Sequence, residues 1–306
     1  MSPASMPPYA VVDPGPDRVG ESPVWDAQAD ALWWVDIDAC RIKRWARSTH
    51  QVQVWTLPER IGCLALADDG GLIAALEQRI VHAHPKPDGG LDLTDLAHIT
   101  HPTHGMRFND GRCDASGRLW VGTMVMDPAR NLALGGFYTL DERGLTGPHI
   151  ESLHTANGSA FSPDGRVLYV SDSHPLSQQI WAADLDLATG GLSDCRPFVD
   201  MRPLPGRPDG AAVDALGNYW ICGNDAGLIH CFSAQGALIR SLCVPFPKPS
   251  MCCFGGPGLS TLFVTSIVPA DPALDPGGLS GAVIAIECGT QGQPEPRFSR
   301  YPGKRR

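Results

Sequence analysis

The sequence lacks the features of several functional classes. No apolar run approaches the roughly 20 residues that a membrane-spanning helix needs. Lysine and arginine are concentrated only in the last three residues and the formal net charge is −9, so nucleic acid and anionic membranes are poor partners for this chain. The segment 1–16 is rich in proline but has neither a charged region nor an apolar one, and we therefore expect no signal peptide.

Motifs of other enzyme classes are also missing. None of the ten cysteines belongs to a Cys-x-x-Cys pair and most lie in apolar segments, which is typical of buried thiols in a reducing cytoplasm. The adjacent Cys252 and Cys253 are interpreted as part of a core strand. No Gly-x-Ser-x-Gly sequence supports a serine hydrolase. We therefore expect a cytoplasmic protein without thiol or serine catalysis.

Amphipathic helical patterns of useful length are absent, whereas 34 glycines and 28 prolines mark turns throughout the chain. Six times a short turn precedes an apolar, mostly aromatic pair, at intervals of 39 to 51 residues, which match one four-stranded propeller blade. We predict an all-β fold, a six-bladed β-propeller over residues 17–302 after an N-terminal extension, residues 1–16. A pair of β-sandwiches is the alternative. The apolar pairs are Trp33-Trp34, Leu72-Ile73, Leu119-Trp120, Leu168-Tyr169, Tyr219-Trp220 and Leu262-Phe263.

Four polar residues occupy nearly the same position in their repeats. Each lies 11 to 13 residues before the second member of its apolar pair; they are Glu21, Asn109, Asn157 and Asp209. Taken singly, Asn-Gly and Asp-Gly are ordinary turn sequences. Equivalent positions in repeats around an axis, however, lie at equivalent places in space, so these oxygen-bearing side chains should converge at one end of the axis. Convergent oxygens suggest a divalent cation.

Five segments follow one another in order between about residues 18 and 267. They are Gly20-Glu21-Ser22-Pro23-Val24-Trp25, Arg107-Phe108-Asn109-Asp110-Gly111, Asn157-Gly158 with Phe161-Ser162-Pro163-Asp164-Gly165, Pro208-Asp209-Gly210, and Cys252-Cys253-Phe254-Gly255-Gly256. Together they resemble the regucalcin and gluconolactonase family. Members of that family are six-bladed propellers that hydrolyse sugar lactones with a divalent metal in the central channel.

The resemblance implies that Glu21, Asn157 and Asp209 are metal ligands. Two carboxylates neutralise a divalent cation, and the asparagine adds a neutral oxygen. An all-oxygen set favours hard ions such as Ca²⁺, Mg²⁺ or Mn²⁺, although Zn²⁺ and ferrous iron also accept carboxylates. Three side-chain ligands leave positions open for water and a lactone carbonyl, so the expected cofactor is one such ion acting as a Lewis acid. Asp209 is expected to guide or deprotonate the attacking water, unless the metal itself acidifies it.

Three residues are expected to bind substrate. The resemblance implies that Arg107 and Asn109 face it, and Asp127 is the nearest candidate for a family glutamate that contacts the sugar after the strand containing Gly122-Thr123-Met124. A permanently cationic arginine suits donation to hydroxyls. The alternative for Arg107 is an ion pair with an aspartate between blades.

We therefore expect a metal-dependent hydrolase that opens an aldonolactone to its aldonic acid, with a small sugar lactone as its partner. Two other functions stay open. One is an organophosphate or aryl-ester hydrolase on the same scaffold, because one polarising metal serves phosphoryl and acyl centres alike. The other is a calcium-binding regulator without catalysis. No sequence feature indicates the oligomeric state.

Overall fold

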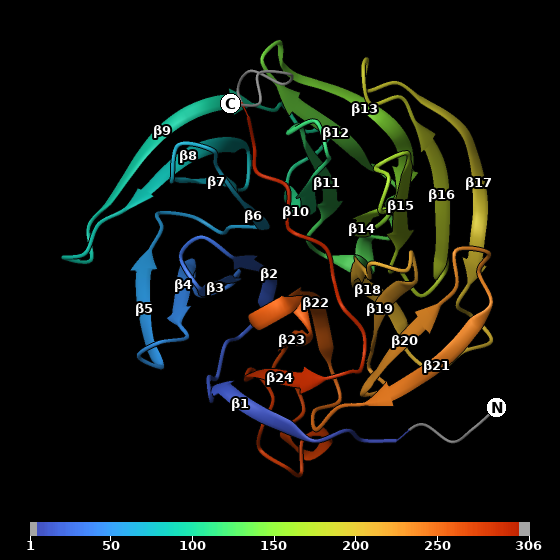
Figure 1. Cartoon of the computed structure of the whole chain (residues 1–306). Coiled ribbons are helices and arrows are strands. Elements are labelled where there is room, and N and C mark those ends of the chain that lie inside the picture. Colours follow the sequence, from blue (N-terminus) through green and yellow to red (C-terminus); the bar gives the residue numbers. More distant parts are fainter. Residues whose placement is uncertain (1–4, 300–306) are drawn as a thin grey trace.

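The computed structural model of the protein describes residues 5–299, which form six four-stranded antiparallel sheets around one axis (Figure 1). The predicted six-bladed β-propeller is confirmed. Apart from strands, the described residues contain three short 3₁₀ helices, η1 (Pro128–Arg130), η2 (Pro257–Leu259) and η3 (Pro272–Leu274). None of these could reach across a membrane, and the described part of the chain has no longer apolar helix.

The strands of each blade follow the chain from the axis outward. Blade 1 consists of β2 (Gly20–Asp26), β3 (Ala31–Asp36), β4 (Arg41–Ala46) and β5 (Gln51–Thr56). Blade 2 consists of β6 (Cys63–Leu66), β7 (Leu72–Ala75), β8 (Arg79–Pro85) and β9 (Leu91–His98). Blade 3 consists of β10 (Met106–Cys113), β11 (Leu119–Val125), β12 (Gly135–Asp141) and β13 (Gly144–Leu153).

The second half of the ring repeats this order, except for the last strand. Blade 4 consists of β14 (Ala156–Phe161), β15 (Val167–Asp172), β16 (Gln179–Leu185) and β17 (Leu192–Asp200). Blade 5 consists of β18 (Arg207–Val213), β19 (Tyr219–Asn224), β20 (Leu228–Phe232) and β21 (Leu238–Cys243). Blade 6 consists of β22 (Pro249–Gly255), β23 (Thr261–Ser266), β24 (Val283–Glu287) and β1 (Tyr9–Asp13).

The outer strand of blade 6 comes from the beginning of the chain. Residues 9–13, which the sequence places in an extension, form β1 and pair with β24 through Tyr9↔Ile286 and Val11↔Ile284 (Figure 1). Without β1, the backbone groups along that edge of β24 would have no ladder partner. The N-terminal segment thus belongs to the propeller and joins its two ends. The predicted end at residue 302 lies outside the described residues.

The six apolar pairs all lie in the second strands of their blades, and their large side chains fill the space between neighbouring blades. Trp220 meets Phe254 of blade 6 edge to face at 6.0 Å, and Trp25 stacks on Phe263 at 5.4 Å. Cys252 and Cys253 are buried in β22, as the sequence predicts. The cores between blades are therefore continuous around the ring.

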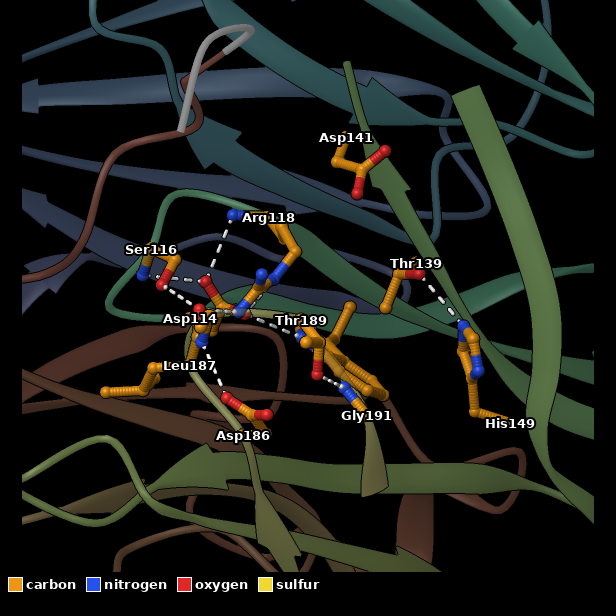
Figure 2. Close-up of polar contacts among 12 residues, drawn as sticks. Asp114, Ser116, Arg118, Thr139, Asp141, His149, Asp186, Leu187, Thr189 and Gly191 are labelled. Carbon is orange, nitrogen blue, oxygen red and sulfur yellow. Dashed lines mark hydrogen bonds and ion pairs between the residues drawn. The ribbon is translucent and has the colours of Figure 1, made fainter. Parts of the chain in front are cut away.

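The turn after β10 in blade 3 is hydrogen-bonded to the next blade. Asp114 accepts hydrogen bonds from Arg118 Nε at 2.7 Å and Trp120 Nε1 at 3.1 Å. Arg118 Nη2 and Ser116 Oγ then donate to the carbonyl oxygen of Leu187 in blade 4, at 2.8 and 2.9 Å (Figure 2). The buried charge of Asp114 is thus fully matched by protein donors.

A C-terminal strap, defined as residues 289–299, crosses the axis where the inner strands end (Figure 1). It touches five blades. The contacts are Arg297 with Asp26, Phe298 N with Leu66 O at 2.7 Å, Glu295 with Arg112 at 2.6 Å, Ala215 N with Gln291 O at 2.8 Å, and Gly292 N with Leu259 O at 2.8 Å. We call this the strap end of the axis, and the opposite end, where the inner strands begin, the site end.

Candidate functional site

A β-bulge interrupts the pairing of the first two strands in every blade except blade 2. Glu21 and Asn157 are the last paired residues before their bulges, whereas Asn109 and Asp209 follow the last paired residue of theirs. The shared repeat position predicted from the sequence is therefore kept to within one residue. Because a bulge bends the strand and re-aims its side chains, it allows these residues to face their neighbours across the axis.

Four of the predicted site residues form one hydrogen-bonded chain across blades 3, 4 and 5. Arg107 Nη1 donates to Asn109 Oδ1 at 2.6 Å. Asn109 Nδ2 donates to Asn157 Oδ1 at 2.9 Å, and Asn157 Nδ2 donates to Asp209 Oδ1 at 2.8 Å. Since Asn109, Asn157 and Asp209 are all buried, these bonds fix their side chains relative to one another.

Glu21 faces the same space from blade 1. Its Oε2 accepts a hydrogen bond from the backbone N–H of Ser22 at 3.1 Å. Burial, followed by the negative charges of Asp209 and Asp110, holds the pKa of Glu21 well above its ordinary value. Burial also raises the pKa of Asp209 to about 7, against the effect of its hydrogen bond from Asn224. The two carboxyl groups therefore act on each other at the site end.

Two residues that the sequence analysis missed are hydrogen-bonded to this chain of side chains and hold it in place. Asn224 Nδ2 donates to Asp209 Oδ2 at 2.5 Å, and Ser173 Oγ accepts from Asn157 Nδ2 at 2.7 Å. Each lies four residues after the second member of its apolar pair. Because the second strand of a blade runs antiparallel to the first, its end meets the beginning of the first strand. A polar residue four positions after the apolar pair was therefore the sequence signal that could have predicted both.

The donor set fits a divalent cation. Neither Glu21 nor Asp209 has an ion-pair partner among residues 5–299, and Asn224 Oδ1, beside Asp209, is buried without a hydrogen-bond partner in that range. Glu21 is partly buried and Asp209 is buried, and carboxylates withdrawn from water without a cationic partner are costly, a cost that a bound cation removes. Together with the amide oxygen of Asn157, the two carboxylates supply the oxygen ligands that hard ions accept.

Arg107 is not the inter-blade ion pair that the sequence left as an alternative. It is partly exposed, makes no ion pair among the described residues, and donates to Phe108 O at 2.8 Å as well as to Asn109. The guanidinium group is thus held at the site end without being neutralised by a partner carboxylate.

Asp127 lies on the rim of the site end, beyond the end of β11. It is exposed, and its Oδ1 accepts a hydrogen bond from Ala129 N at 3.0 Å as the N-cap of η1. This contact gives Asp127 a structural role that the sequence analysis did not include. Its contact with a sugar stays a prediction.

Comparison with known proteins extends over most of the chain. Residues 19–268 match the family model described as SMP-30/Gluconolactonase/LRE-like region. A 6-deoxy-6-sulfogluconolactonase of Pseudomonas putida is 35% identical over 288 residues, 93% of this chain and 96% of the relative. Regucalcin of Xenopus laevis is 34% identical over 255 residues, 81% of this chain and 83% of the relative. A crystal structure of a calcium-binding protein, regucalcin, from Agrobacterium tumefaciens has a TM-score of 0.90 and 25% identity, covering 98% of this chain and all of that one.

Proposed function

The chain belongs to the SMP-30/gluconolactonase/LRE-like family, and we propose that it is a hydrolase that opens a sugar lactone to the corresponding aldonic acid. The observation that carries this proposal is the hydrogen-bonded chain from Arg107 through Asn109 and Asn157 to Asp209, with Glu21 beside it. It combines a cationic donor for substrate hydroxyls with carboxylates placed to act on a carbonyl. Similarity to a sulfogluconolactonase over most of the chain supports the reaction class.

In this proposal Glu21, Asn157 and Asp209 bind one divalent cation. When bound, such a cation supplies Lewis-acid polarisation of the lactone carbonyl. The protein contributes the orientation of the ligands, because Asn224 holds Asp209 and Asn109 holds Asn157. Residues that orient metal ligands in this way commonly affect metal affinity as well as activity.

Asp209 also guides the attacking water. Hydrogen bonds from Asn157 and Asn224 to its two oxygens keep the carboxylate in one orientation, from which it can accept a hydrogen bond from water. The water oxygen bonds to the carbonyl carbon and the ring C–O bond breaks. One water proton ends on the former ring oxygen, which becomes a hydroxyl, and the other is released as the acid ionises.

Arg107 and Asn109 position the sugar. The guanidinium group is held by Asn109 Oδ1 and Phe108 O at the beginning of β10, and its planar set of donors suits vicinal hydroxyls. A polyhydroxylated lactone therefore fits this site better than an apolar ester does.

The decisive experiment is a panel of gluconic, xylonic, arabinonic and galactonic lactones, assayed with Ca²⁺, Mn²⁺, Mg²⁺, Zn²⁺ and ferrous iron after subtraction of spontaneous hydrolysis. We expect turnover of at least one sugar lactone that chelator abolishes. Turnover of aryl esters or organophosphates but of no lactone would favour the alternative hydrolase. Tight calcium binding with no turnover of any of these compounds would favour the regulator.

A second observation favours a lactone that carries an acidic substituent. Arg207 Nε pairs with Asp225 Oδ2 at 2.7 Å, and Lys248 pairs with the other oxygen of the same carboxylate. Two cations pair with one carboxylate, so one of the two positive charges has no carboxylate of its own within ion-pair distance among residues 5–299. Arg207 also donates to Ser173 O at 3.3 Å, and Ser173 in turn holds Asn157, so the charged group adjoins the site. The relative from P. putida is named for a sulfonated gluconolactone.

Kinetics with paired substrates test this second candidate. We expect Arg207→Met to raise KM for a lactone with a sulfonate or phosphate at its terminal carbon by about tenfold, because a charge-assisted hydrogen bond is lost. KM for the neutral parent lactone should stay nearly constant. Equal changes for both substrates would assign Arg207 a structural role and leave the neutral sugar lactone as the substrate.

A further inference from the structure

Asp69, His82 and His84 form a second cluster of metal-ligand residues, in blade 2. One possible ligand atom from each lies within 4.8 Å of the others. His82 Nε2 is 3.1 Å from Asp69 Oδ1, and the ring centroids of the two histidines are 4.1 Å apart. None of the three belongs to the site at the axis, so the cluster requires its own explanation.

The strand pairing of blade 2 brings these residues together. His82 and His84 are two apart on β8 and therefore lie on the same face of the strand. Ile73 in β7 pairs with His82, which places the turn before β7 beside the two imidazoles. A Cβ atom on Gly71 in this turn would lie 2.4 Å from His82 Nε2 and 2.8 Å from His84 Cε1. Only glycine at this position lets both rings approach the turn that carries Asp69.

The contact between His82 and Asp69 has the distance of a hydrogen bond but not its alignment. His82 Nε2 is buried and has no hydrogen-bond partner among the described residues, although Asp69 Oδ1 is 3.1 Å away. In a tetrahedral zinc site with bonds of 2.0–2.1 Å, two ligand atoms lie about 3.3 Å apart and both point at the metal. The 3.1 Å separation of His82 Nε2 and Asp69 Oδ1 and their poor alignment are expected of two ligand atoms that point at the same metal position.

We propose that Asp69, His82 and His84 bind a divalent transition-metal ion of the zinc class. Two imidazoles and one carboxylate suit Zn²⁺, Ni²⁺ or Cu²⁺, whereas the oxygen ligands at the axis suit harder ions. The two sites thus select different metals. Asp69 and His84 are exposed, so solvent can supply the fourth ligand and the ion can enter without a change in the fold.

Zinc binding to the full-length chain tests the proposal, in a background in which Asp209→Ala disables the axis. Calorimetry with Zn²⁺ should detect one site in this variant. Adding His84→Ala or Asp69→Ala should weaken that site at least tenfold, and both positions are exposed enough for the fold to survive. The matched control is His98→Ala in β9, because His98 Nε2 is 3.2 Å from Asp95 Oδ2 but belongs to no three-residue ligand cluster within residues 5–299.

Each possible result of the calorimetry either supports or overturns the proposed zinc site. No zinc binding in the Asp209→Ala background, or binding that survives His84→Ala within twofold, would overturn the proposal. An equal loss with His98→Ala would mean that scattered surface histidines bind the ion, and would overturn it as well. Activity plays no part in the readout, so failure of the lactonase proposal would leave this result unaffected.

Gly71→Ala gives an independent check, because it keeps all three ligands and fills the space between them. We expect it to reduce zinc affinity at least tenfold, since the new methyl group must displace the His82 ring. In the Asp209→Ala background, zinc should also raise the melting temperature by about 2 °C or more at saturation, through preferential binding to the folded state. An unchanged melting temperature with zinc after Gly71→Ala is added to this background, beside a rise without it, would support the site. Equal rises would contradict it.

Discussion

Both ends of the propeller axis bury carboxylates, but the surroundings of these carboxylates are opposite. At the strap end, Asp114 pairs with Arg118, and Arg112 pairs with Glu295. At the site end, Glu21 and Asp209 have no ion-pair partner among residues 5–299, and their pKa values are raised chiefly by burial. A carboxylate already matched by its own protein stabilises the fold. A carboxylate left unmatched is available to a ligand, and this difference supports the proposal that the site end is the functional one.

The largest expected effect comes from removing a carboxylate at the site end. Asp209→Ala should lower kcat/KM for a sugar lactone at least about a thousandfold, because the proposed function makes Asp209 both a metal ligand and the guide of the attacking water. Metal affinity should fall as well. Steady-state kinetics and chelator competition measure the two effects.

The fold provides the control for Asp209→Ala. In chelator, the variant and the parent should have similar melting temperatures, because removal of a buried carboxylate without an ion-pair partner offsets the loss of its hydrogen bonds from Asn157 and Asn224. Near-parental activity in Asp209→Ala would show that the active site lies elsewhere. A large loss of stability in chelator would make Asp209 a structural residue, like those at the strap end.

The corresponding change at the strap end should affect stability instead. Asp114→Ala leaves Arg118 buried without its partner and removes an acceptor for Trp120, so we expect a loss of about 3 kcal/mol in the free energy of unfolding. Urea denaturation measures it. Activity per folded molecule should stay within about twofold of the parent, and a selective loss of activity would erase the distinction between the two ends.

Arg107→Ala tests whether the site end recognises hydroxyl groups. Loss of charge-assisted hydrogen bonds worth roughly 1.5 to 3 kcal/mol should lower kcat/KM for sugar lactones about ten- to a hundredfold. An unsubstituted lactone of the same ring size should be affected much less, and metal affinity should barely change. Equal losses on both substrates would mean that Arg107 acts on the carbonyl or on the scaffold.

The smallest effect compares two asparagines with the same local task. Asn224 donates to Asp209 at 2.5 Å at the site end, and Asn218 donates to Asp214 at 2.9 Å at the strap end. Asn224→Ala should weaken metal binding about tenfold, because it frees the carboxylate to rotate. Asn218→Ala should leave metal affinity unchanged and cost about 1 kcal/mol of stability. Chelator competition on both variants checks the pair, and identical affinities would refute a positioning role for Asn224.

The sequence predicted the fold because the blade is a local unit. Each turn and apolar pair lies within one repeat, and all six pairs occur in second strands. Ring closure is not local, so β1 looked like an extension. Its partner, β24, lies at the other end of the chain, and no periodic pattern marks the pairing of Asp13 with Val283.

The site was predictable where one strand position repeats. Asn109, Asn157 and Asp209 meet as expected, although bulges shift their phase by one residue. Asn224 was not predicted as a site residue because a polar residue at a strand end is also typical of an ordinary turn. The cluster of Asp69, His82 and His84 was not predicted for another reason. Its aspartate and histidines come together only through the pairing of β7 with β8, which residue spacing does not reveal.

The position of β1 in blade 6 determines the order in which parts of the propeller can form during synthesis. Asp13 is synthesised 270 residues before its partner Val283, an interval of roughly 14 to 54 s at 5–20 residues per second. Throughout that interval β1 lacks its native strand partner. Glu21 in blade 1 likewise reaches Asp209 in blade 5 only around the ring that blade 6 completes. Closure of the ring and assembly of the full set of proposed ligands are therefore one event, so we expect the proposed cation to bind only after the ring has closed.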